Sequence, residues 1–130
     1  MKIASGIRWG RVLIAVLAAH LANAAVAVLL ITVYSLAASV TQANPGGGLA
    51  EPLASRAAVW PLPVMTFVAA AWATRGTSGP TALLHGLLVG GLVAAGFGLL
   101  YFWPFSPGTL APFALAFAVA LPGSAIGRRL

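Results

Sequence analysis

The sequence predicts an all-α fold, an integral membrane bundle of four transmembrane helices that fills residues 1–130 as a single domain. Hydrophobic residues make up 61% of the chain and charged residues 6%, whereas charged residues are about 25% of an ordinary soluble domain. So few charged side chains cannot cover the surface of a soluble protein of this size. Four long apolar segments, separated by stretches rich in proline and glycine, supply the helices. We therefore expect lipid to surround most of the chain.

The first helix is predicted over about residues 12–39, which is long enough to cross ~30 Å of hydrocarbon with some tilt. The apolar run from Val12 to about Val40 is much longer than the roughly 7–15 apolar residues of a cleaved signal peptide. We therefore expect a retained signal anchor. The Asn-Pro-Gly-Gly-Gly stretch at residues 44–48 cannot continue a helix and predicts a flexible connection.

The second helix is predicted over about residues 57–74 and carries Pro61 and Pro63 near its start. Proline is harmless in the first turn of a helix, where its missing N–H has no partner, and it kinks a helix elsewhere. If this helix begins only at Pro61, it is short for a full membrane span. Some non-helical backbone would then enter the membrane zone, where it needs protein or water around it.

The third and fourth helices are predicted over about residues 81–102 and 110–126. A tight turn at residues 75–80 precedes the third helix, and Ser78 is a candidate N-cap. The short loop at residues 103–109 joins the two helices as a hairpin.

The distribution of basic residues predicts that both termini are cytoplasmic. Only Arg56 would lie outside, close to Glu51, which carries the opposite charge. The residues that would lie inside are Lys2, Arg8, Arg11, Arg75, Arg128 and Arg129. Cytoplasmic segments of membrane proteins carry an excess of lysine and arginine, and such residues also contact anionic lipid headgroups. We expect the protein in the bacterial cytoplasmic (inner) membrane, with an N-in/C-in topology.

Small residues recur at intervals of four on three of the predicted helices, as in extended GxxxG motifs, and the fourth helix has Ala116, Ala120 and Ser124. The third helix has Ala82, Gly86, Gly90, Ala94 and Gly98. The first helix has Ala15, Ala19, Asn23 and Ala27. Such ridges let membrane helices approach closely and gain dispersion contacts. The ridge on the third helix predicts packing, either against the first or fourth helix of this chain, which we favour because four helices must first bury one another, or against another subunit.

Two histidines, His20 and His85, are predicted at similar depths in the membrane. Ionisable groups inside a membrane are costly, so each needs an explanation. A neutral histidine can hydrogen-bond across a helix interface, and we expect His85 to meet the polar stripe of the first helix formed by His20 and Asn23. The alternative is that the two imidazoles ligate a haem iron axially.

The polar inventory argues against several functions. Aspartate and cysteine are absent, and Glu51 is the only glutamate, so the sequence offers no intramembrane carboxylate for proton coupling and no metal-binding cluster. The basic residues are scattered, so we expect no nucleic-acid partner. We expect no cofactor and a non-enzymatic structural or accessory subunit that packs against other membrane helices, in a homo-oligomer or a larger complex. The alternatives are a haem- or pigment-binding electron-transfer or light-harvesting component, and a small-solute channel or carrier formed by an oligomer.

Overall fold

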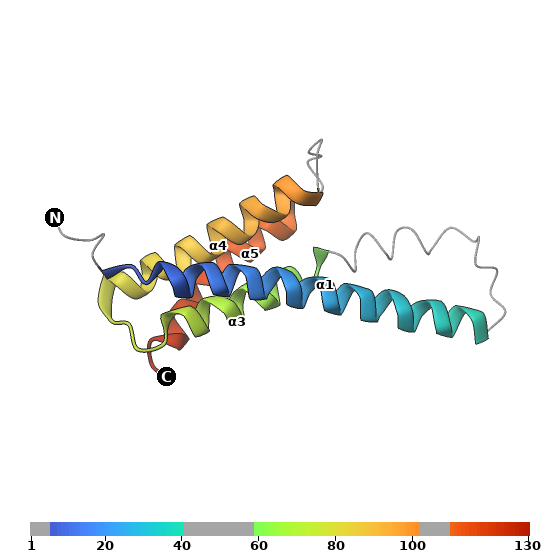
Figure 1. The fold of residues 1–130 in the computed structure, drawn as a ribbon, viewed down its shortest axis with the longest axis horizontal. Helices are drawn as coiled ribbons and strands as arrows, with labels where there is room; N and C mark the ends of the chain where they lie inside the picture. Colours follow the sequence, from blue (N-terminus) through green and yellow to red (C-terminus); the bar gives the residue numbers. More distant parts are fainter. Residues whose placement is uncertain (1–5, 41–58, 102–109) are drawn as a thin grey trace.

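The computed structural model describes residues 6–40, 59–101 and 110–130, and these residues form four helices and no strand (Figure 1). The prediction of an all-α fold is confirmed. The helices are α1 (Trp9–Val40), α3 (Leu62–Thr74), α4 (Gly79–Tyr101) and α5 (Leu110–Gly127). Residues 41–58 and 102–109, with Glu51, Arg56 and Trp103, lie outside the described residues, as does Lys2.

Two of these helices are long and apolar enough to cross a membrane, namely α1 over Trp9–Ala37 and α4 over Gly79–Leu99. Helix α3 is shorter, with 13 residues, and rises about 20 Å, which is less than the ~30 Å of a hydrocarbon core. The apolar part of α5 is also shorter than a full span. The structure therefore supports two spans of the four that the sequence predicts.

The short length of α3 has a physical cause in its prolines. The helix was predicted from residue 57, but it is regular only from Leu62, with Pro61 as the N-cap and a proline in the first turn. Residues 57 and 58 lie outside the described part of the chain. The prolines thus lie at the N-cap and in the first turn of α3, where a missing N–H has no partner to lose, and a turn at Trp60 and Pro61 separates α3 from the helical Val59.

A turn joins α3 to α4 and brings their ends together. The backbone N–H of Arg75 donates to Trp72 O at 3.2 Å, and the N–H of Thr77 donates to Thr74 O at 3.0 Å. Gly76 has a φ of 67°, which is the left-handed conformation that glycine adopts readily after a helix end. The start of α1 and the C-terminal end of α5 lie near this turn, at one end of the bundle (Figure 1).

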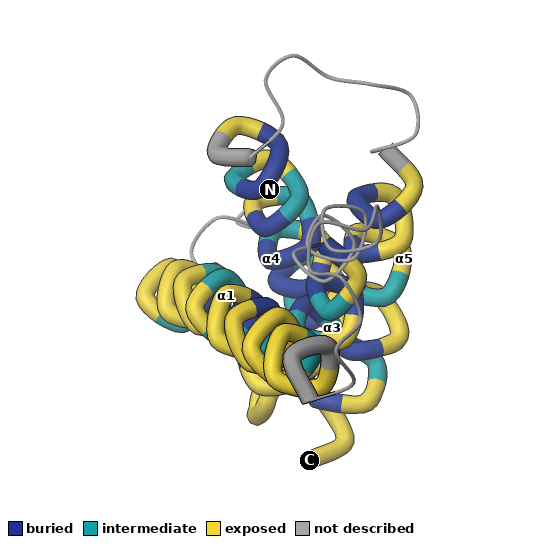
Figure 2. Tube along the Cα trace, turned by 90° about the vertical axis from the view of Figure 1, so that its right-hand side faces the viewer, coloured by how far each residue is buried: buried dark blue, intermediate teal, exposed yellow. Residues whose placement is uncertain are grey.

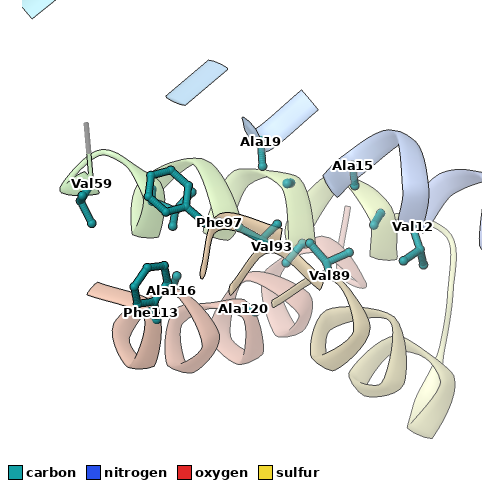
Figure 3. Packing of buried hydrophobic residues seen from close by; sticks show 14 residues of the cluster. Val12, Ala15, Ala19, Val59, Val89, Val93, Phe97, Phe113, Ala116 and Ala120 are labelled. Atoms are coloured by element: carbon teal, nitrogen blue, oxygen red, sulfur yellow. The ribbon is translucent and has the colours of Figure 1, made fainter. Parts of the chain in front are cut away.

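The core of the described residues is built mainly from valine and alanine. Figure 3 shows Val89, Val93 and Phe97 of α4 between alanines of α1 and alanines of α5. The ring of Phe97 lies 5.7 Å from that of Phe113, at an angle of 53°, a tilted arrangement that aromatic pairs favour. Figure 2 shows that α1 is exposed over most of its surface, with a narrow buried stripe towards the other helices.

Candidate functional site

The closest helix contact that the predicted ridge makes is between α4 and α5. A Cβ atom placed on Gly86 would lie 2.5 Å from Ser124 Cβ and 3.0 Å from Ala120 O. One placed on Gly90 would lie 2.7 Å from Ala120 Cβ and 3.4 Å from Phe117 O. Carbon atoms normally approach to about 3.5–4.0 Å, so these positions accept only glycine at this distance. The structure thus places Gly86 and Gly90 against a helix of the same chain.

The other predicted packing residues are mostly buried. Ala82 and Gly98 of α4 are buried, and Ala94 is half-buried. The α1 ridge is buried at all four positions, which are Ala15, Ala19, Asn23 and Ala27. The side chains that this ridge turns inward are small, which lets α1 approach α3 and α4.

A second glycine interface, between α3 and α5, was missed by the sequence analysis. A Cβ atom on Gly123 would lie 2.6 Å from Phe67 O, and one on Gly127 would overlap the carbonyl oxygen of Ala71 and the hydroxyl of Thr74. Gly123 and Gly127 are themselves four residues apart, so the same spacing rule would have found them.

His85 is fully buried and joins the start of α1 to the first turns of α4. Its Nε2 accepts a hydrogen bond of 3.0 Å from the backbone N–H of Arg8. Its Nδ1 lies 2.7 Å from the carbonyl oxygen of Thr81, so this nitrogen carries the proton and donates. Both partners require the neutral Nδ1–H tautomer. The expectation that His85 meets the stripe of His20 and Asn23 is therefore wrong. The backbone N–H of Arg8, which precedes that stripe, binds the unprotonated Nε2 of His85.

His20 lies further along the bundle in an apolar setting. Its ring stacks on Phe97 with centroids 6.1 Å apart and planes 11° apart. A Cβ atom on Gly96 would lie 3.0 Å from His20 Nε2, so the missing side chain makes room for the imidazole. Neither ring nitrogen of His20 has a hydrogen-bond partner among the described residues.

The structure does not bring the two histidines together. Gly96, which His20 contacts, is 11 residues from His85 on α4, a distance of about 16 Å along the helix. Both nitrogens of His85 are occupied by backbone groups. Within residues 6–40, 59–101 and 110–130, no group of three histidine, cysteine or acidic side chains is placed to hold a metal. The geometry thus assigns the histidines to different parts of the bundle.

These features define a helical protein whose buried polar groups and glycines serve contacts between helices. No protein-family model matches the sequence, and no curated protein or solved structure is significantly similar to it. The functional argument therefore depends on the packing of this chain alone.

Proposed function

We propose that the chain is a small multi-pass integral membrane protein that acts as a non-enzymatic structural or accessory subunit. It packs against other membrane helices in a homo-oligomer or a larger complex. Its location is the bacterial cytoplasmic membrane, with four spans and both termini cytoplasmic, as the bias of the basic residues indicates.

The observation that carries this proposal is the distribution of side-chain sizes on α1. The inward face holds Ala15 and Ala19, whereas Leu13, Leu17 and Leu21 point outward and are 57%, 61% and 64% exposed. A helix that is apolar on all sides is stable when it is buried in protein or surrounded by lipid. Most of α1 is not buried in this chain. Large side chains outside and small ones at the helix contacts are the pattern of membrane helices.

The length of α1 supports a protein partner as well as lipid. Its apolar segment has 29 residues and rises about 44 Å. To fit within ~30 Å of hydrocarbon it would need a tilt of about 46°, beyond the range of about 0–40° seen for membrane helices. Residues 28–37 are exposed except for Tyr34, which is half-buried. We propose that another helix covers this distal part of α1, because its apolar surface is unfavourable in water.

The membrane location is tested first, by alkaline extraction of membranes and by tags at Met1 and Leu130. We expect the protein to stay in the membrane and both tags to be accessible only from the cytoplasmic side. Release by alkali, or tags on opposite sides, would overturn the proposed threading.

The subunit role is then tested with Val33→Gln and Leu36→Gln together, two exposed positions in the distal part of α1. We expect the parent protein to migrate in mild detergent as an assembly larger than a monomer and this variant to migrate as a monomer. The control is Leu121→Gln with Ile126→Gln, which removes exposed apolar surface from α5. A parent protein that is monomeric in membranes and in detergent contradicts the proposal.

A further inference from the structure

An open apolar groove lies between α1 and α3, with a volume of about 340 Å³. Its floor is formed by buried alanines, and larger exposed side chains such as Ile14, Val68 and Trp72 form its rim. Every residue that lines it is apolar: Ile14, Ala15, Ala18, Ala19, Ala22, Met65, Val68, Ala69 and Trp72. The groove follows α1 for about 12 Å, so its shape is elongated and its chemistry suits a hydrocarbon chain.

Both walls of the groove continue into an arginine at the same end. On α1, Arg11 precedes Ile14 by three residues and Ala18 by seven, a spacing that places all three on one face of the helix. On the other wall, Arg75 follows Trp72 by three residues, directly after the end of α3. Arg11 and Arg75 thus both lie beyond the end of the groove that the basic residues predict to be cytoplasmic.

The two arginines are held close together, and no acidic side chain occurs among residues 6–40, 59–101 and 110–130. Arg11 Nη1 donates a hydrogen bond of 2.6 Å to the backbone carbonyl of Arg75. A guanidinium carries five N–H donors, so most donors of Arg11 remain for a ligand. The only acidic residue of the chain, Glu51, lies outside the described residues. A planar guanidinium matches the geometry of a phosphate group.

We infer that this groove is a binding site for one anionic phospholipid. An acyl chain lies between α1 and α3, and the lipid phosphate binds Arg11 and Arg75. Basic pockets between helices at the cytoplasmic side are suited to acidic headgroups, and Trp72 lies at the level where tryptophan favours the lipid interface. The inference rests on the membrane location proposed above and adds a specific ligand to it.

The test is native mass spectrometry of the full-length protein in detergent, with phosphatidylglycerol and phosphatidylcholine of identical acyl chains in equal amounts. We expect the parent protein to retain phosphatidylglycerol in preference. Each arginine near an anionic lipid contributes a factor of about five in affinity, so Arg75→Gln lowers the preference roughly fivefold and Arg11→Gln with Arg75→Gln roughly 30-fold. Arg75→Gln alone is the cleaner variant, because Arg11 bonds to the backbone of Arg75 and keeps that contact.

Three further measurements separate the parts of the site. Arg128→Gln with Arg129→Gln removes the same charge as the double variant from the end of α5, which does not line the groove, and leaves the preference within twofold. Ala18→Phe fills the groove and lowers retention of both lipids. Inorganic phosphate at millimolar concentration does not displace the lipid, because the acyl chain contributes to binding.

The proposal is overturned by equal retention of the two lipids, by an equal effect of the control pair, or by displacement with phosphate. It is also overturned if Ala18→Phe disrupts assembly without changing lipid retention, since a partner helix would then occupy the groove. A protein that resists alkaline extraction but shows no lipid preference refutes the lipid site and leaves the proposed membrane location intact.

Discussion

Replacing Gly86 by alanine tests the contact between α4 and α5 with a single methyl group. The new Cβ atom would lie 2.5 Å from Ser124 Cβ and 2.8 Å from Ser124 Oγ. An ordinary carbon contact is about 3.5–4.0 Å, so α5 must move away by about 1.0–1.5 Å at this point. Overpacking of this kind costs about 1–3 kcal/mol. We expect Gly86→Ala to lower the free energy of unfolding, despite the higher helix propensity of alanine.

The matched control is Gly91→Ala on the same helix. A Cβ atom there would meet only Phe117 Cε2, at 3.8 Å, which is an ordinary contact. The gain in helix propensity, about 1 kcal/mol, is common to both variants and cancels in their comparison. The difference between them is therefore about 1–3 kcal/mol and reports the contact alone. It can be measured by equilibrium unfolding in mixed detergent micelles, followed by circular dichroism. Equal stability of the two variants would refute the close approach of α4 and α5.

Three further predictions concern α5 and the histidines. Gly127→Ala should be at least as destabilising as Gly86→Ala, because its methyl group would overlap a main-chain carbonyl of α3. The control is Gly10→Ala, whose methyl group would have no other atom within 4 Å. This control should be neutral or stabilising in the same assay. His85→Ala should lower the free energy of unfolding by about 2–4 kcal/mol, because it leaves a cavity and deprives the Arg8 N–H of its acceptor. His20→Ala should lower it only by the stacking energy of about 0.5–1.5 kcal/mol. A larger loss of stability for His20→Ala than for His85→Ala would contradict the assigned roles. Haemin added to the purified protein should give no absorption band of bis-histidine iron, and a stoichiometric band would show that the two imidazoles meet.

The helices α1 and α4 could be predicted from the sequence because their apolar runs are long and begin beside arginine or glycine. The late start of α3 was available as one of two readings of Pro61 and Pro63, and only the backbone decides between them. The spacing of small residues predicted Gly86 and Gly90 as contact positions. The sequence left the first and the fourth predicted helix as possible neighbours, because a residue spacing defines a face of one helix and does not select the helix opposite, and the structure places α5 there.

The contacts of His85 could not be predicted for a related reason. His20 and Asn23 are the polar side chains that the sequence places at a similar depth. The actual partners are two backbone groups, those of Arg8 and Thr81. Every residue carries such groups, so a single sequence gives no signal for which of them a buried imidazole will reach. Helix ends are where backbone N–H groups remain free, and the N–H of Arg8 lies directly before α1.

The two kinds of helix contact explain why the groove lies beside α1. Between α3, α4 and α5, glycines allow backbone atoms to touch, and a single added methyl group would force the helices apart. The buried stripe of α1 has alanine where those interfaces have glycine, and Gly10, in its first turn, has open space around it. Alanine keeps neighbouring backbones further apart than glycine does, and the large side chains of α1 point outward. The remaining space between α1 and α3 is the lipid groove. Substitutions at the glycines of α4 and α5 should therefore change stability, whereas those at Ala18 and Arg75 should change what the protein binds.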